Sequence, residues 1–193
     1  MVQDFTEDKV FTRQKFVSTP LPKGDYEYCT FQNCDFSGGD ISEIRFLECE
    51  FIGCNLSTVN LMETSLRDVQ FEDCKMLGVQ FEECNDLIFS ADFVNCQLNH
   101  STFYRMKLPG TTFSNCKLHE VDFTESDLSE VIFADSDLRN AVFDHTVLEK
   151  ADLRNAVNYA IDPETNRIAW AKFSVPAVTG LLSKYEIQID FGE

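Results

Sequence analysis

The chain has 193 residues, of which 44% are hydrophobic and 12% aromatic, and a formal net charge of −17. This composition excludes wholesale disorder, and no stretch approaches the roughly 18 consecutive apolar residues that a membrane helix needs. The first residues lack the basic start and the apolar run of a signal peptide, so we expect a cytoplasmic protein. The negative charge argues against direct binding of nucleic acid and favours a basic partner.

The first 24 residues repeat poorly. Phe11, Phe16 and Leu21 are nevertheless spaced by five, and the segment from Pro20 to Gly24 is typical of a turn. We predict either an imperfect first coil or an N-terminal cap over residues 1–24.

From residue 25 to residue 157 a large apolar side chain recurs at every fifth position. A period of five fits neither the 2.0 of a flat strand nor the 3.6 of a helix. It fits a chain that turns a corner every five residues, with the large residue and the small residue two positions before it pointing inward. Four such sides close one coil of about 20 residues, whose neighbours stack about 4.8 Å apart.

Sorting the inward residues at intervals of 20 tests this closure, with 22 allowed at a two-residue slip near 84–88. One side then collects phenylalanines and the adjacent side mainly leucines, as stacked rings and stacked aliphatic chains require. The columns are Phe31, Phe51, Phe71, Phe93, Phe113, Phe133 and Leu153, and Phe36, Leu56, Met76, Leu98, Leu118 and Leu138. The slip should bulge outward near Asp86, either as a functional feature or as a tolerated insertion.

The polar and sulfur-containing residues show no arrangement typical of catalysis or metal binding. All eight cysteines occupy the small inward position, without CxxC pairs or Cys/His clusters, so we expect free, buried thiols. The three histidines fall at outward positions, and no nucleophile has an activating base at a suitable spacing. We therefore expect no enzyme, no cofactor and no bound metal.

Residues 158–193 leave the repeat. Ser174 and Pro176 predict the start of a short helix, and residues 186–191 alternate like a final apolar strand. Trp170 lies at the junction and is expected to pack. The apolar side chains of this element either cap the last coil or join two rods into a homodimer. The predicted dimer interface comprises Val178, Leu181, Leu182, Tyr185, Ile187 and Ile189.

Consecutive motifs such as CTFQN, CDFSG, VDFTE, SDLSE and ADLRN resemble those of the pentapeptide-repeat family, summarised as A(D/N)LXX. The resemblance implies an all-β, right-handed quadrilateral β-helix without enzymatic activity. The acidic rod with its C-terminal element is similar to the quinolone-resistance and self-immunity branch of the Qnr, MfpA and McbG types. That likeness implies an end-to-end dimer that binds DNA gyrase or another type II topoisomerase by mimicking DNA. The chain lacks the long projecting loops of many Qnr-type proteins and in this respect resembles the loopless members.

The charge distribution agrees with such a mimic. Residues 21–157 hold 25 Asp and Glu against 10 Lys and Arg, or roughly one net charge per 2 Å of rod, comparable to duplex DNA. The side built on Phe36 and Leu138 is neutral, whereas the side built on Ile41 and Phe143 is acidic and has Arg105 as its counter-charge. Its predicted partner-binding residues are Asp40, Glu43, Glu63, Glu82, Glu83, Asp122, Glu125 and Asp144. The alternative function is a structural interaction scaffold with an unrelated partner.

Overall fold

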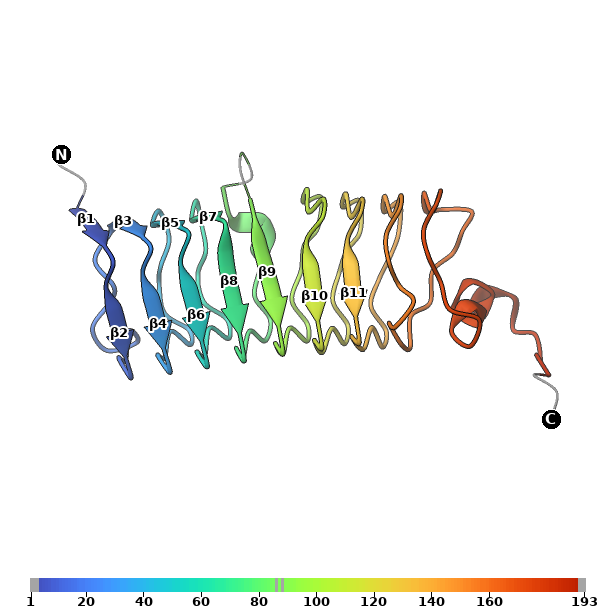
Figure 1. Cartoon of the computed structure of the whole chain (residues 1–193), viewed down its shortest axis with the longest axis horizontal. Helices are drawn as coiled ribbons and strands as arrows, with labels where there is room; N and C mark the ends of the chain where they lie inside the picture. The colour runs from blue at the N-terminus through green and yellow to red at the C-terminus, as the bar shows by residue number, and fades with distance from the viewer. Residues whose placement is uncertain (1–3, 86, 88, 191–193) are drawn as a thin grey trace.

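The computed structural model describes residues 4–85, 87 and 89–190 as a four-sided rod, with β1 near one end of its long axis and the last described residues near the other (Figure 1). The rod is the right-handed quadrilateral β-helix that the sequence predicts. Its elements are β1 (Asp4–Glu7), β2 (Val10–Thr12), β3 (Gly24–Glu27), β4 (Thr30–Gln32), β5 (Arg45–Leu47), β6 (Glu50–Ile52), β7 (Ser65–Arg67), β8 (Val69–Glu72), η1 (Phe81–Glu83), β9 (Ala91–Val94), β10 (Thr112–Ser114), β11 (Ile132–Ala134), η3 (Val178–Leu181) and η4 (Ser183–Tyr185).

Two sides of the rod are parallel sheets. One has the order β1-β3-β5-β7 and the other β11-β10-β9-β8-β6-β4-β2. Phe31 pairs with Phe51, one coil of 20 residues away, whereas Phe71 pairs with Phe93, 22 residues away. The two extra residues predicted from the sequence therefore fall in the coil between β8 and β9. Leu87 is 85% exposed there, while Asp86 lies outside the described residues.

The other two sides are too short for regular strands and are held by single parallel bridges. Asp35 pairs with Asn55, and Asp40 pairs with Asn60, again at a step of 20 residues. At most corners the chain turns through a residue with positive φ, such as Glu63 at 56° or Asn115 at 51°. These corners are the physical origin of the five-residue period.

Stacked aromatic rings fill the core as predicted. The rings of Phe31 and Phe51 are 4.7 Å apart and nearly parallel, and those of Phe93 and Phe113 are 5.0 Å apart. Phe103, on the opposite side, meets Phe113 edge-on at 81°. Parallel stacks along the axis and perpendicular contacts across it are both favourable aromatic geometries, so one residue type packs in two directions.

All eight cysteines are free and buried, as predicted. Their thiols also form hydrogen bonds: Sγ of Cys54 donates to the carbonyl oxygen of Phe31 at 3.2 Å and accepts from the backbone N–H of Cys34 at 3.3 Å. Ser136 plays the same role further along this column, where its Oγ accepts from the N–H of Cys116 at 3.0 Å. Burial raises the pKa of the Cys49 thiol to about 12, which keeps it protonated and unreactive.

The N-terminal segment is a first coil rather than a separate cap. β1 pairs with β3 and β2 pairs with β4 in the same register as the later coils. The ring of Phe11 stacks on that of Phe31 at 4.8 Å, and the ring of Phe16 stacks on that of Phe36 at 4.6 Å. The five-residue spacing of Phe11, Phe16 and Leu21 therefore indicates a coil of the β-helix and not a separate cap.

The coils continue past residue 157, where the sequence predicted their end. Val147 pairs with Arg167 and Asp152 pairs with Lys172, each one coil apart. Asn166 occupies the small inward position and bonds two backbone groups of the preceding coil, because its Nδ2 donates to the Phe143 carbonyl at 3.0 Å and its Oδ1 accepts from the Thr146 N–H at 2.8 Å. A polar inward residue interrupted the sequence pattern, although the five-residue spacing resumes at Ile168.

The predicted short C-terminal helix is present as two 3₁₀ helices, η3 and η4, of four and three residues rather than as one continuous helix. The carbonyl of Gly180 accepts a hydrogen bond from the N–H of Ile161 at 3.0 Å, which takes it out of a helical ladder. A Cβ at position 180 would lie 2.3 Å from the Tyr159 carbonyl oxygen, so glycine is required there. Residues 186–190 pair with no strand among the described residues, so the predicted final strand is absent. Within the described part of the chain, no helix is long and apolar enough to cross a membrane.

The stacked rings generate a first prediction. Phe113 is fully buried between Phe93 and Phe133, so Phe113→Ala leaves a cavity and should lower the free energy of unfolding by about 3–5 kcal/mol. Ser114→Ala on the outward side of β10 is the control and should change it by less than about 0.5 kcal/mol. Urea unfolding measures both, and equal losses would contradict the assignment of the columns.

The C-terminal cap generates a second prediction. The hydroxyl of Tyr159 is buried without a hydrogen-bond partner among the described residues, and burial raises its pKa to about 12. Removing an unsatisfied buried hydroxyl is neutral or favourable, so Tyr159→Phe should leave stability unchanged or raise it by about 1 kcal/mol. Gly180→Ala, which clashes with the same residue, should instead destabilise the cap. A clear loss of stability on thermal unfolding of Tyr159→Phe would contradict this interpretation.

Candidate protein-interaction face

The predicted acidic residues lie on one side of the rod, which we call the acidic face: Asp40, Glu43, Glu63, Glu82, Glu83, Asp122, Glu125 and Asp144. Parallel bridges set their register. Asp122 pairs with Thr102 before it and with Val142 after it, and the N–H of Glu63 donates to the carbonyl of Glu83 at 2.9 Å. The carboxylates therefore stand in columns along the rod axis rather than scattered over its surface.

The aspartates just before the large inward residue have a structural task. Oδ1 of Asp40 accepts the N–H of Ser42 at 2.9 Å, and Oδ1 of Asp122 accepts the N–H of Thr124 at 2.8 Å. Hydrogen bonds from Ser42 lower the pKa of Asp40. Asn60 makes the same bond to the N–H of Met62 at 3.0 Å, so the turn needs a side-chain oxygen and not a charge. The D/N position of the A(D/N)LXX motif is explained by turn formation alone.

Both ends of the acidic face carry counter-charges. Nζ of Lys23 lies 3.8 Å from carboxylate oxygens of both Asp40 and Glu43, a contact that the sequence analysis missed because Lys23 precedes the regular repeat. Towards the other end, Arg105 binds Glu125 through two hydrogen bonds of 2.7 and 3.1 Å, which lowers the pKa of that glutamate. Nδ1 of His145 lies 2.9 Å from Asp144.

The middle of the acidic face has no such compensation. Glu63, Glu82 and Glu83 form no ion pair with any described residue, and Glu63 and Glu83 are not buried. Burial raises the pKa of Glu82, and the nearby carboxylates of Glu83 and Asp122 add to the effect. Met62, 56% exposed, stands among these carboxylates. The strongest unpaired negative charge of this side is therefore local, around one apolar side chain.

The adjacent side is close to neutral, as predicted. The three carboxylates Asp35, Glu120 and Asp137 stand there with Lys75, Lys117 and Arg139. Nε2 of His119 contacts Asp137 at 2.8 Å, and Nδ1 of His100 contacts Glu120 at 3.3 Å. All three histidines thus pair with carboxylates at the surface.

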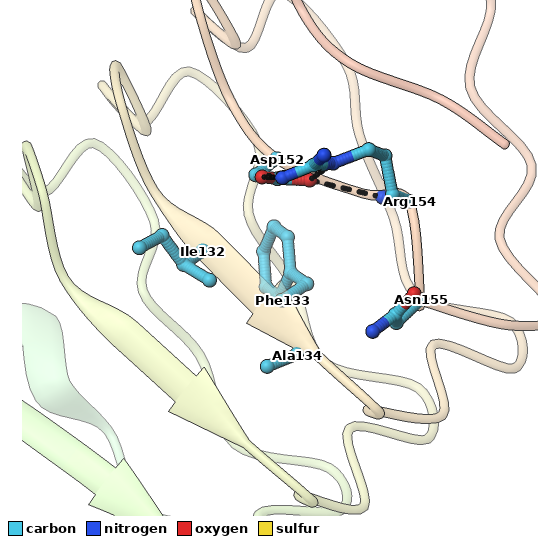
Figure 2. Close-up of a pocket in the computed structure, with 6 residues that line it drawn as sticks. All are labelled: Ile132, Phe133, Ala134, Asp152, Arg154 and Asn155. Atoms are coloured by element: carbon cyan, nitrogen blue, oxygen red, sulfur yellow. Dashed lines mark hydrogen bonds and ion pairs between the residues drawn. The ribbon is translucent and has the colours of Figure 1, made fainter.

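A shallow depression of about 340 Å³ lies on β11 and the coil after it, as Figure 2 shows. Phe133 forms its floor, and the small side chain of Ala134 leaves it open. Arg154 folds back onto Asp152, with its Nη2 donating to Oδ2 at 2.7 Å. An ion pair beside a buried ring provides neither a nucleophile nor a proton-transfer pair, so the depression reflects the absence of a large side chain at position 134.

The predicted dimer residues separate into two groups. Leu181 packs against the core and acts as part of the cap. Val178, Leu182, Tyr185, Ile187 and Ile189 remain between 38% and 55% exposed. Two further apolar side chains outside the predicted interface are exposed as well: Val175 is 81% exposed, and Trp170 is 84% exposed, so the prediction that Trp170 packs is wrong. We call these seven exposed residues the C-terminal patch.

Comparison with known proteins places this geometry in context. The pentapeptide repeat region family matches residues 25–86 and 86–157. A trypsin-treated form of QnrB1, described as a plasmid-mediated fluoroquinolone resistance protein, is 20% identical over 97% of this chain and 100% of that chain, with a TM-score of 0.45. HetL, a pentapeptide repeat protein involved in heterocyst differentiation regulation in the cyanobacterium Nostoc sp., is 13% identical over 90% of this chain and 87% of its own, with a TM-score of 0.44. No curated protein sequence matches the chain.

The turn-forming aspartates generate a third prediction. Asp122→Asn keeps the acceptor for the Thr124 N–H and should change the free energy of unfolding by less than about 0.5 kcal/mol, whereas Asp122→Ala removes it and should cost about 0.5–2 kcal/mol. Urea unfolding of the two variants distinguishes turn formation from charge. If the asparagine variant is destabilised as much as the alanine variant, the carboxylate charge itself matters.

Proposed function

Because the chain belongs to the pentapeptide repeat family, whose match covers more than half of it, we propose that it is a non-enzymatic, cytoplasmic protein that acts through its surface. The proposed activity is binding of DNA gyrase or another type II topoisomerase at the site that duplex DNA would occupy. Protection against fluoroquinolones or immunity to a topoisomerase toxin would be its outcome. The acidic face would enter the basic groove of the enzyme.

The observation that carries this proposal is the pair Glu63 and Glu83, which are exposed, lie one coil apart and form no ion pair with any described residue. Elsewhere on the rod, some carboxylates pair with a basic residue one coil away, as Glu125 pairs with Arg105 and Glu130 with Lys150. Unpaired carboxylates at a spacing of about 4.8 Å create the negative potential that a DNA-binding groove attracts. The exposed Met62 among them would add apolar contact area to a mainly electrostatic interface.

The proposal includes a homodimer formed through the C-terminal patch. Two rods joined end to end would double the length of the acidic surface, which suits a partner that binds an extended duplex. The exposed apolar side chains of Val178, Leu182 and Ile187 support such a contact, because single surface hydrophobics are common but contiguous groups mark interaction sites.

An interaction scaffold with an unrelated partner is the second candidate. Negative charge also keeps regular rods from associating edge to edge, so the same acidity suits a passive module. This function predicts no effect on topoisomerases at any protein concentration.

The fourth prediction tests the proposed function. Purified gyrase should supercoil DNA less efficiently as micromolar protein is added, since the two compete for one groove. Reversing the charge with Glu63→Lys and Glu83→Lys should weaken this inhibition at least about tenfold, because two charge-assisted contacts become repulsive. Asp35→Lys and Asp137→Lys on the neutral side are the matched control and should change it less than about threefold.

Circular dichroism and urea unfolding of each pair confirm that the coils remain folded. Absence of both inhibition and drug protection with the unmodified protein would eliminate the topoisomerase proposal. Equal weakening by the two pairs would remove the assignment to the acidic face and leave only net charge.

A further inference from the structure

Trp170 is the single tryptophan of the chain and is 84% exposed. It occupies a corner with a φ of 62°, in the left-handed region that bulky residues rarely adopt. Other corners in its column, one or more coils away, carry Tyr28, Glu48, Asp68 and Lys150. Tyr28 uses its hydroxyl to bond Glu48 at 3.2 Å, whereas Trp170 has neither a hydrogen bond nor a ring contact with any described residue. Neither folding nor solubility explains an indole at this position.

The charges around Trp170 differ from those of the rest of the rod. Residues 166–185 contain Arg167, Lys172 and Lys184 and no acidic residue, in a chain whose net charge is −17. Residues 186–193 show the reverse, with Glu186, Asp190 and Glu193 and no basic residue. The C-terminal element thus has a basic segment and an acidic segment that follow each other directly.

The acidic tail is suited to cover an apolar surface. Ile187 and Ile189 alternate with polar residues and are 55% and 39% exposed. Because Trp170 is 84% exposed, these isoleucines do not bury its ring within one chain. Lys184 bridges Asp162 and Glu164 at 2.7 Å each, and Arg167 contacts Glu149 at 2.6 Å. Lys172 is the least engaged of the three cations, with Asp152 at 3.9 Å.

We propose that Trp170 is an anchor of the contact between two copies of this chain, in which residues 186–190 of each copy pack over the coil that carries Arg167, Trp170 and Lys172 of the other. This inference rests on the proposed homodimer and specifies how it forms. A twofold axis makes each contact twice, and it brings the basic segment of one element onto the acidic segment of the other. Tryptophan and arginine are the residues that most often dominate binding energy at such interfaces.

The single tryptophan allows a direct test, our fifth prediction. Fluorescence emission of the unmodified protein is measured over a dilution series alongside its mass by light scattering. We expect a red-shifted maximum, typical of an indole in water, at low concentration, and a blue shift that follows the rise in mass from 22.1 kDa towards twice that value.

Two variants complete the experiment. Trp170→Asn suits the left-handed corner and should fold normally, yet weaken dimerisation at least about 30-fold, the effect expected for an interface hot spot. Tyr28→Asn makes the same kind of change at the same corner near the other end of the rod, with a φ of 53°, and should leave dimerisation unchanged.

The outcomes separate the two levels of the proposal. If the mass doubles without a blue shift of the emission, Trp170 is not in the contact, although the dimer exists. The same conclusion follows if Trp170→Asn dimerises as strongly as the unmodified protein. A mass of one chain at every concentration, with constant emission, removes the homodimer itself and the anchor with it. Neither result bears on gyrase binding by the acidic face.

Discussion

The stacking of one inward side chain on the residue one coil away is the contact on which this structure depends. Phe31 on Phe51, and Phe103 on Phe123 at 5.4 Å, repeat the same contact along the axis. Because the inward columns run without interruption, the outward columns must run in register with them. Charged side chains of successive coils therefore lie about 4.8 Å apart, even where they carry the same charge and repel each other. The ion pair between Arg105 and Glu125, and that between Lys150 and Glu130, join residues one coil apart and reduce the repulsion that stacked carboxylates would create.

The regular repeat also distinguishes carboxylates that stabilise a turn from carboxylates that have no structural role and are available to a partner. Asp40 and Asp122 hold turn amides, as Asn60 does without a charge, so their presence on the surface says little about a partner. Glutamates at the corners have no such task. Glu63 and Glu83 are members of the acidic face that lack both this task and an ion pair with described residues, which is why the functional proposal rests on them rather than on the total of −17.

The ends of the rod pose a different problem, because a stack cannot bury its own last layer. At the C-terminal end, residues 174–185 cover the last coil, and the contacts between this cover and the coil are imperfect. Tyr159 loses a hydrogen bond for its hydroxyl, Gly180 is required by close contact, and apolar side chains beyond Leu181 stay exposed. The cover shields the core through Leu181 and at the same time exposes apolar side chains to solvent. The same segment can therefore both cap the rod and contact a second copy.

The five-residue period determined the fold, the inward columns, the buried cysteines and the neutral and acidic sides, because inward and outward positions alternate with a strict local rule. It did not determine where the rod ends: Asn166 satisfies buried backbone groups that only the neighbouring coil supplies, and so a polar residue continues the core. The sequence likewise favoured a short helix at residues 174–185, and the close contact of Gly180 with Tyr159 accompanies its division into the two 3₁₀ helices η3 and η4. Lys23 near Asp40 and the exposure of Trp170 were equally beyond local reasoning. Each depends on contacts between residues distant in sequence at the two ends, where the repeat no longer dictates the neighbours.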